Sequence, residues 1–488
     1  MKIKELVSFA TPRTLLFYFA VLILLLSVAI SELGFALNNP ILFIAGTIIL
    51  ALWFVIIFIA LLPKTNIALV KHTNKLKRGA LIIFVLLLFI GLSEAALIII
   101  VIPGLIHNQN ISGDFHQLLM EVEDGYKYND ASALSEQAVE SLLHGQNPYA
   151  RSNIIQALSK YNASYDRVTP LRAGSFSKVF PAPQDSQLER VWNKAIHHPD
   201  LIPLELESRV CYPAASFLLL APFIFLGIKD IRVVYAIFFL AGLTYALWVI
   251  PKEKRFLFMG VVLISLELWN SLADGGELGN LCFPFLMVAW LALNKNFWLS
   301  AICMGLAVAT KQTAWFFLPF YLILVFKTQG VKKLLTALSL VAGVFVITNL
   351  PFVINDPKIW LFSIMSPMTD KMFPLGSGLI TLITSSLLNI QSPLPFTILE
   401  GIAFIVGVIW YFKYCQSYPQ TGIVLAIIPL FFAWRSLFSY FFYVDVIALA
   451  YILVNDHASH QPTATNISLA ADSVLVHANV AVIQVSEK

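Results

Sequence analysis

The chain has 488 residues, of which 58% are hydrophobic and only 12% are charged. Soluble globular proteins carry about 25% charged residues, so the composition excludes an ordinary soluble protein. The net charge of +4 is small and spread over short loops, and it gives no indication of nucleic-acid binding. The four cysteines lie far apart in or beside apolar segments, without the spacing of a metal site, and we expect small core residues.

Apolar runs of about 15–27 residues recur along the chain, and such runs are typical of transmembrane helices. We therefore expect an all-α polytopic integral membrane protein with about 11–14 transmembrane helices and a large outer loop carrying short amphipathic helices. The first run lacks a small-residue cleavage site, which favours an uncleaved span. The expected spans are about 14–31, 41–63, 80–105, 212–228, 233–250, 256–270, 280–294, 297–311, 313–326, 334–352, 397–413, 421–434 and 437–454.

The distribution of lysine and arginine predicts the orientation, because loops rich in these residues stay in the cytoplasm. Basic residues precede the first span, and five more lie within 64–78, whereas the loop at 32–40 has none. We expect a multi-pass protein of the inner or plasma membrane with a cytoplasmic N-terminus. Loops 106–210 and 353–396 then lie outside. Alternation fails by one span between 212 and 333, so we expect a half-helix or re-entrant segment between 233 and 294, of the kind that lines polar cavities.

Four regions follow from this reading: N-terminal spans at 1–105, an extracytoplasmic loop at 106–211, a multi-span membrane module at 212–454, and a polar C-terminal tail at 455–488. The loop is unusual because residues 106–210 hold 13 of the 28 carboxylates. An acid-rich loop directly after a span suggests a reactive group at the membrane surface.

Within this loop, apolar residues at helical spacing predict an amphipathic helix along the membrane face, with Asp130 near its start and Gly145 as its C-terminal stop. Asp130 is our candidate catalytic residue, although an aspartate at this position can simply cap the helix. Further candidates for substrate binding in the same stretch are Glu136, Asn147 and Tyr149.

Several polar interruptions of the apolar pattern supply the other candidates. Lys311 is flanked by apolar spans, where a charge is costly and often functional, or it is a lysine that reaches the surface from a helix end. The break at 274–280 is either a plain loop or the lining of a cavity. Arg435 at a span junction is suited to a phosphate, or it is a surface arginine. The candidate binding residues in these segments are Tyr212, Glu277, Asn280, Lys311, Gln312, Asp370, Arg435 and Tyr440.

Taken in order, the motif Asn129-Asp130…Glu136…Gly145-x-Asn147-Pro148-Tyr149 resembles the first outer loop of bacterial GT-C membrane glycosyltransferases, in particular glycosyltransferase family 87. The resemblance extends over roughly residues 80–450, through Tyr212-Pro213, Gly279-Asn280, the segment ending at Lys311-Gln312, and the Pro-x-Gly-x-Gly-Leu loop at 374–379. The chain departs from the family in having Cys-Tyr-Pro-Ala at 211–214 in place of Tyr-Pro-Pro, and Gly279 in place of a polar residue.

The resemblance implies a GT-C-like enzyme that moves a sugar, such as mannose or another hexose or pentose, from a polyprenyl-phosphate carrier to an envelope glycan, lipid or protein on the extracytoplasmic side. Membrane lipids surround it and nucleic acid plays no part. Asp130 matches the family's acidic residue at the reaction centre. A carboxylate can deprotonate the acceptor hydroxyl, and preorganised cations can stabilise the leaving phosphate, with Lys311 and Arg435 as first candidates and Arg209 as a further one.

Two alternatives to a glycosyltransferase stay open at this point. The chain could be a transporter or flippase of a lipid-linked sugar, with a polar site between its middle spans, or a structural scaffold in an envelope complex. No cofactor is indicated with certainty, but Asp130 with Glu136, or Asp274 with Glu277, could hold a divalent cation.

Overall fold

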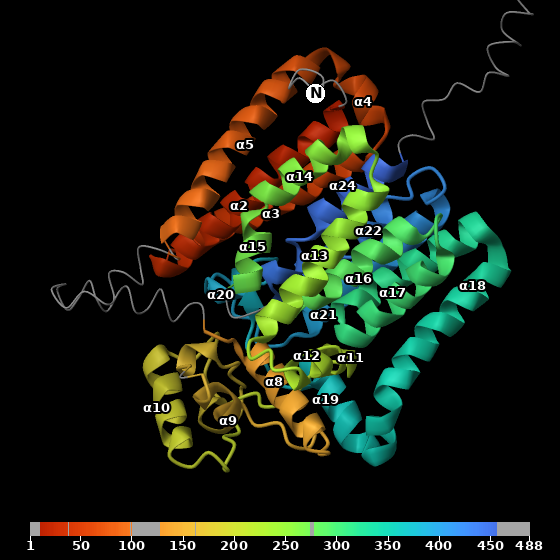
Figure 1. Ribbon diagram of the computed structural model, residues 1–488. Helices are drawn as coiled ribbons and strands as arrows, with labels where there is room; N and C mark the ends of the chain where they lie inside the picture. Colours follow the sequence, from red (N-terminus) through yellow and green to blue (C-terminus); the bar gives the residue numbers. More distant parts are fainter. Residues whose placement is uncertain are drawn as a thin grey trace, which may run out of the picture.

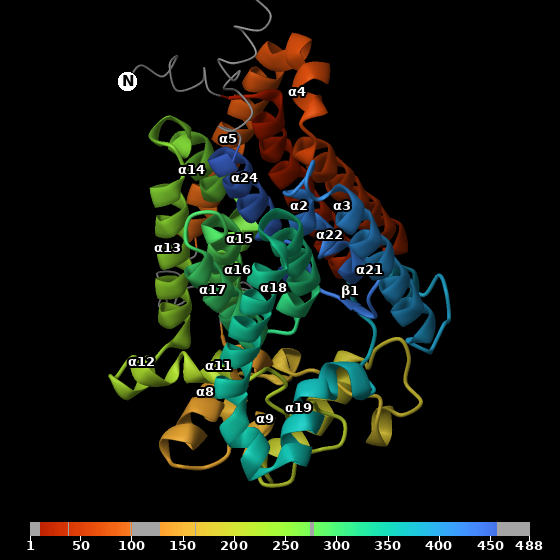
Figure 2. The same ribbon diagram turned by 90° about the vertical axis from the view of Figure 1, so that its right-hand side faces the viewer.

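A computed structural model describes residues 10–37, 39–97, 99, 127–161, 163–273 and 278–455. Nearly all regular structure in this part of the chain is helical, with one two-stranded sheet of two residues per strand. Figures 1 and 2 show a bundle of long helices with a smaller group of short helices at one end. We call described residues 127–211 the acid-rich module.

The N-terminal part is a group of three long helices, α2 (Pro12–Ala36), α3 (Pro40–Leu61) and α5 (Thr73–Ala96), with α4 (Lys64–Ala68) and η2 (Val70–His72) between the last two. Proline occupies the first position of α2 and α3, where its missing N–H costs nothing. The side chains of Thr11 and Asn39 cap these two helices. The buried Arg13 guanidinium then donates to the carbonyls of Ala60 and Leu61 at the end of α3, which fastens the two helices together.

The acid-rich module contains short helices joined by long irregular segments. Its core is small: Ile154, Ile155 and Leu158 of α9 are fully buried, together with Phe176. In Figure 1 it lies below the bundle, with α11 and α12 above α8 and with α19 beside it. Its elements are α8 (Asp130–Leu143), α9 (Ile154–Ser159), η4 (Tyr165–Arg167), η5 (Gly174–Phe176) and α10 (Asp185–Ile196).

The remainder forms the larger part of the bundle. The helices are α11 (Ala215–Leu218), α12 (Ala221–Phe225), α13 (Ile231–Val249), η6 (Lys252–Lys254), α14 (Arg255–Ile264), α15 (Leu266–Ala273), α16 (Gly279–Ala292), α17 (Phe297–Thr310), α18 (Thr313–Asn355), α19 (Pro357–Thr369), α20 (Thr381–Thr384), α21 (Leu394–Tyr414), α22 (Thr421–Leu425), α23 (Ile428–Phe431), η7 (Phe438–Tyr440) and α24 (Val444–Asn455). Strands β1 (Leu375–Gly376) and β2 (Arg435–Ser436) pair in parallel.

Among the described residues, seven helices are long and apolar enough to cross a membrane, or up to eight if the bent pair α14–α15 is one span. The chain is therefore a multi-pass membrane protein by helix length and composition. The described residues therefore contain fewer helices of spanning length than the expected 11–14. The expected spans at 280–294 and 297–311 are helices of 14 residues, about 21 Å long at 1.5 Å per residue, shorter than a hydrocarbon core of about 30 Å. The two spans expected at 313–326 and 334–352 both lie in α18, which consists of two helices joined at a kink at Gly330, where φ is 82°.

The broken helix expected between 233 and 294 is present. Helices α14 and α15 are bent by 56° at Ser265, whose ψ of 70° is not helical. The following residues 274–277, which include two of the acidic residues considered above, lie outside the described part. The polar tail is likewise described only at residue 455.

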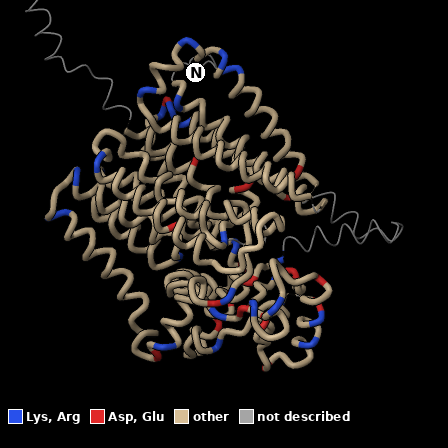
Figure 3. The backbone as a smooth tube through the Cα atoms, turned by 180° about the vertical axis from the view of Figure 1, so that it is seen from behind, with Lys and Arg blue, Asp and Glu red and all other residues tan. Residues whose placement is uncertain are grey.

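Charged residues gather at the two ends of the molecule (Figure 3). Lysine and arginine predominate around α4 and the start of α5, whereas both signs of charge lie in and near the acid-rich module. The middle of the bundle is nearly free of charge among the described residues, as a membrane-embedded region must be. The acid-rich module and the basic loop at 64–78 therefore lie at opposite ends.

Candidate active site

Asp130 is the first residue of α8, and its side chain is not the helix cap. That role belongs to Asn129, whose Oδ1 accepts the Ser132 N–H at 2.8 Å. Asp130 is half-buried, and its Oδ1 accepts the Ala131 N–H at 2.7 Å. Its Oδ2 accepts the Thr169 hydroxyl at 2.6 Å. The carboxylate is thus held in place at a helix N-terminus, whose partial positive charge favours an anion.

The expected helix is confirmed as α8, including its end, but its expected position along the membrane face is not, because protein covers its apolar side. Gly145, with φ of 69°, follows the last turn of α8 and takes the left-handed position that glycine adopts after helices. The apolar face of α8 is covered by protein: Ala133, Leu134 and Ala138 are buried, and α9, α11 and α12 pack against the helix.

Backbone hydrogen bonds bring three distant segments to Asp130. The Glu207 N–H donates to the Thr169 carbonyl at 2.9 Å, which places Glu207 beside the residue that holds Asp130. Nearby, the Arg172 N–H donates to the Lys371 carbonyl at 2.7 Å. Residues 169–172, 205–207 and 370–372 therefore run side by side, and Asp370, expected at the site, joins the acid-rich module.

Glu207 and Asp370 form a pair of neighbouring acids. Glu207 is buried, and its Oε1 accepts the N–H groups of Ser208 and Arg209. Burial raises the pKa of Glu207 well above its ordinary value, and a hydrogen bond to Asp370 adds to the rise. Arg209 lies 3.3 Å from the Asp370 carboxylate and partly opposes that rise. Two carboxylates at one buried place cannot both ionise easily, so the pair is suited to holding a proton.

Cys211 connects these acids with Lys311. The pKa of its thiol is raised to about 12, chiefly by burial, then by the charges of Glu207 and Asp130, and Lys311 acts in the opposite direction. Gln312 Nε2 donates to the Cys211 carbonyl and, at 3.1 Å, to the Ile364 carbonyl. The segment between α17 and α18 is thereby fastened to the end of the acid-rich module.

Lys311 is buried at the break between α17 and α18, where its backbone is extended. Its ammonium lies 5.7 Å from the centre of the Tyr440 ring, a cation–π contact. A Cβ added to Gly279 would lie 3.6 Å from the Lys311 Nζ, so glycine at 279 leaves room beside the ammonium. Lys311 and Tyr440, both candidate binding residues, thus lie together with Gly279.

Arg435 lies on β2, opposite Leu375 of β1. The pairing depends on glycine: Gly376 has φ of 117°, and a Cβ there would lie 1.9 Å from the Ser436 carbonyl oxygen. A Cβ on Gly378 would lie 2.0 Å from the Phe431 carbonyl oxygen. The Pro-x-Gly-x-Gly-Leu pattern therefore marks a close backbone contact that fixes the position of Arg435.

Other candidate residues are engaged in contacts within the protein. Glu136 is buried and pairs with Lys160 at 3.0 Å. Six residues apart on one helix, Asp130 and Glu136 project about 120° apart, so the structure does not bring them together. Asn280 exchanges hydrogen bonds with Ser271, at 2.8 and 3.1 Å.

Asn147 and Tyr149 link the acid-rich module to the bundle. The Asn147 Nδ2 donates to Asn355 Oδ1 at 2.8 Å, and the Tyr149 hydroxyl donates to the Tyr212 carbonyl at 2.9 Å. The Asn-Pro-Tyr pattern thus positions the module on the helices. Glu277 lies outside the described residues.

Among the described residues, no group of three or more His, Cys, Asp and Glu side chains could hold a metal ion. Of the pairs considered for a divalent cation, Asp130 and Glu136 are kept apart on α8, and Asp274 and Glu277 lie outside the described residues. The four cysteines are free, and three of them are buried.

Sequence reasoning did not identify Thr169 or Glu207. Thr169 lies in an irregular segment without a periodic pattern, and its contact with Asp130 depends on the fold of the whole module. Glu207 could have been identified from the sequence. Glu205, Glu207 and Arg209 are charged residues at alternate positions in the segment that leads directly into Cys211-Tyr212-Pro213.

No protein-family model, no curated protein and no solved structure matches this chain.

Proposed function

We propose that the chain is a membrane glycosyltransferase of the GT-C kind, which transfers a sugar from a polyprenyl-phosphate carrier to a hydroxyl group of a glycan, lipid or protein. Asp130 is the general base. The proposal rests on the motif resemblance of the sequence together with the arrangement of charges around Asp130.

The observation that carries the proposal is that Asp130 and Lys311, from distant parts of the chain, both lie near Cys211, because both charges contribute to the shifted pKa of its thiol. A carboxylate and a buried ammonium in one region are the two groups that this transfer needs. The carboxylate is oriented by Thr169 and by α8, and the ammonium by Tyr440 and the break after α17. Orientation of this kind is a large part of enzymatic rate enhancement.

The proposed step is a direct displacement. Asp130 takes the proton of the acceptor hydroxyl as the acceptor oxygen forms a bond to the anomeric carbon of the sugar. The bond between the anomeric carbon and the phosphate oxygen breaks, and its electron pair leaves with the polyprenyl phosphate. One base is sufficient for such an inverting reaction, unlike the paired acids of glycoside hydrolysis.

Lys311 stabilises the charge that develops on the leaving phosphate, as preorganised cations do in other transfer reactions. Arg435 is a second candidate, because among the described residues its half-buried side chain forms no hydrogen bond or ion pair. Arg209 is a weaker candidate, since it already lies 3.3 Å from Asp370. Its position beside the acid pair is better suited to balancing the charge of that pair.

The proposed orientation follows the charges. The basic loop at 64–78 lies at the end of the bundle away from the acid-rich module (Figure 3). With the basic end in the cytoplasm, the N-terminus is cytoplasmic and the site opens on the outer face of the membrane.

The proposed sugar transfer is tested by measuring the formation of a glycosylated acceptor. The purified protein is reconstituted in vesicles with a polyprenyl-phosphate-linked sugar and candidate acceptors, and products are analysed by mass spectrometry. An acceptor extended by one sugar supports the proposal. Because the proposal names only the classes of sugar and acceptor, a panel of mannosyl, other hexosyl and pentosyl donors is used.

A transporter or flippase of a lipid-linked sugar remains the second candidate. It is favoured by the broken helix α14–α15, where Glu267 and the buried Asp445 line one pocket within the bundle, since ionisable residues inside a membrane often mark a transport path. The same vesicles discriminate: a flippase moves the intact lipid-linked sugar to the other leaflet and yields no extended acceptor.

A further inference from the structure

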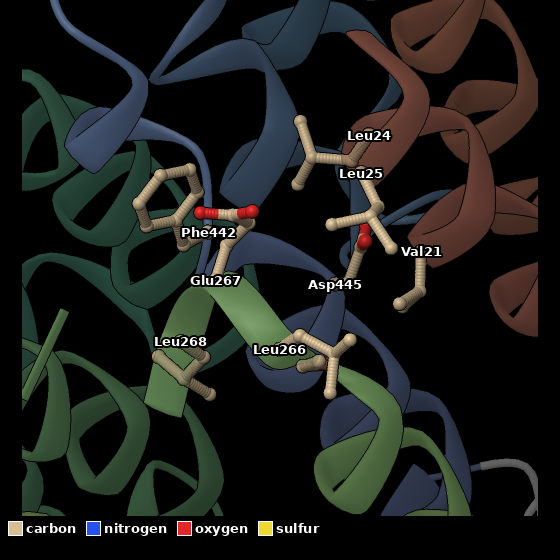
Figure 4. Close-up of a pocket in the computed structure, with 9 residues that line it drawn as sticks. Val21, Leu24, Leu25, Leu266, Glu267, Leu268, Phe442 and Asp445 are labelled. Atoms are coloured by element: carbon tan, nitrogen blue, oxygen red, sulfur yellow. The ribbon is translucent and has the colours of Figure 1, made fainter. Parts of the chain in front are cut away.

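A small pocket lies inside the bundle at the break between α14 and α15 (Figure 4). Helices α2, α15 and α24 contribute its walls. Its volume is about 10 Å³, close to the least space that one water molecule requires. Most of the lining is apolar, with Val21, Leu24 and Leu25 on one side, but two carboxylic acids also line it, Glu267 and Asp445.

Asp445 is the more deeply placed of the two acids, with 1% of its surface exposed. Its Oδ2 accepts a hydrogen bond from the Trp53 indole at 3.2 Å. Its Oδ1 is buried and accepts no hydrogen bond from any described residue. A carboxylate buried in a low-dielectric region is strongly destabilised unless a positive charge or a proton balances it. Asp445 therefore requires a partner at the pocket.

Glu267 supplies a second acid to the same pocket. It lies in the first turn of α15, just past the break, and Figure 4 shows its carboxylate and that of Asp445 at this pocket. Ser265, at the break itself, also lines the pocket and donates its hydroxyl proton to the Val261 carbonyl at 2.8 Å. Its oxygen can therefore serve only as an acceptor toward the pocket. The polar side chains that line the pocket, those of Ser265, Glu267 and Asp445, all offer oxygen lone pairs.

We propose that this pocket binds one small monovalent cation, of the sodium class, between Asp445 and Glu267. Broken helices provide such sites in membrane transporters, where carboxylates and the carbonyl end of a half-helix coordinate the ion. The C-terminal end of α14 and the N-terminal end of α15 meet at the break, and their partial charges have opposite signs. The preference for a cation over an anion therefore comes from the two carboxylic acids.

The size of the pocket argues against a divalent ion. Calcium takes six to eight oxygen ligands, and magnesium keeps several of its waters, whereas this pocket has room for about one water-sized particle. A bound cation connects α15 to α24. Leu268 and Phe442 line this pocket and also the neighbouring pocket at Asn280 and Ser439, so a cation here also stabilises the walls of that second pocket. This inference is independent of the proposed transfer reaction.

The experiment measures the thermal unfolding of the full-length protein in detergent at fixed pH and ionic strength, with sodium chloride replaced stepwise by choline chloride. The variants are Asp445→Asn and Glu267→Gln. Glu400→Gln is the matched control, because Glu400 is a half-buried acid on the membrane helix α21 that does not line this pocket.

We expect sodium to raise the unfolding midpoint of the wild type and of Glu400→Gln in a saturable way, since a ligand that binds only the folded state stabilises it. The rise is abolished in Asp445→Asn and reduced in Glu267→Gln. If Asp445→Asn does not fold, Glu267→Gln and equilibrium binding of radioactive sodium to the wild type, expected at one ion per chain, carry the test.

Equal midpoints in sodium and choline, or the same sodium response in all variants, would overturn the proposal. A midpoint that depends on pH but not on sodium would also overturn it, because Asp445 would then be balanced by a proton alone.

Discussion

The Thr169 hydroxyl donates a hydrogen bond of 2.6 Å to the Asp130 carboxylate, and Thr169 in turn receives the backbone N–H of Glu207 on its carbonyl. One residue thus joins the proposed base to the neighbouring acid pair. In a site of this kind, the residue that orients the base affects the rate without touching the substrate.

We expect Thr169→Val to lower kcat/KM for sugar transfer. Valine keeps the shape of threonine but removes a hydrogen bond to a charged group, and such bonds are worth about 1.5–3 kcal/mol, which corresponds to roughly 10- to 100-fold in rate. Thr169→Ser keeps the hydroxyl and is expected to retain most of the activity. Full activity of the valine variant at equal folded amounts would show that Asp130 is not oriented through Thr169.

The second prediction concerns Glu207 and pH. Because its pKa is raised in the folded state, the folded protein holds a proton that the unfolded chain releases. The stability from this group is complete at pH values below its unfolded pKa of about 4.3, and it is lost as the pH rises through the raised value. The unfolding midpoint of the wild type should therefore decline as the pH is raised toward the alkaline side. We expect this decline to be smaller in Glu207→Gln, as measured by thermal unfolding in detergent.

Glu205 offers a control of opposite sign. Burial would raise its pKa, but hydrogen bonds from the N–H and hydroxyl of Ser175 outweigh burial and lower it. Its stabilising contribution is therefore present above the unfolded pKa and is lost as the pH falls. Glu205→Gln should change the acid side of the profile. If Glu207→Gln changes only that side as well, the raised pKa of Glu207 is wrong.

The third prediction concerns the donor. Removing the ammonium in Lys311→Met should weaken the stabilisation of the leaving phosphate and lower kcat/KM for the donor by roughly 10-fold or more, the effect of a lost charge-assisted hydrogen bond. Lys358→Met, at an exposed lysine of α19, is the matched control. An unchanged donor KM and kcat in Lys311→Met would remove Lys311 from the site.

The fourth prediction concerns the glycine pattern after Pro374. Gly376→Ala places a methyl group 1.9 Å from the Ser436 carbonyl oxygen in a left-handed backbone conformation, and we expect a loss of at least about 1 kcal/mol in stability, with displacement of β2 and Arg435. Gly401→Ala in α21, where a Cβ meets nothing within 4 Å, should be neutral or slightly stabilising. Similar unfolding midpoints for both variants would contradict the proposed role of Gly376.

The helices could largely be predicted from the sequence, and the site only in part. Apolar runs and the spacing around Asp130 predicted most helices and the start and end of α8, because these depend on neighbouring residues. The alternation of spans predicted a broken helix between 233 and 294, but its place at Ser265, inside the span expected at 256–270, was not predicted. The number of spans was harder to predict, since 14-residue apolar helices such as α16 satisfy a hydropathy pattern without the length of a span.

The neighbours of Asp130 depend on contacts between distant segments. The hydrogen bond from Thr169 to Asp130, the backbone bond from Glu207 to Thr169 and the approach of residues 370–372 decide which acids meet. None of these contacts leaves a periodic pattern in the sequence. The N-cap of α8 is Asn129 and not Asp130. The sequence did not decide between these neighbours, because both residue types are favoured at an N-cap.

The most direct measurement compares Asp130→Asn with wild type for sugar transfer in reconstituted vesicles, using polyprenyl-phosphate sugar donors and equal amounts of folded protein. Asp166→Asn, an exposed acid of the same module, serves as the control. If Asp130 is the general base, Asp130→Asn lowers kcat by roughly 100- to 10,000-fold, while Asp166→Asn transfers sugar like the wild type. Undiminished transfer by Asp130→Asn would contradict the assignment of Asp130 as the general base.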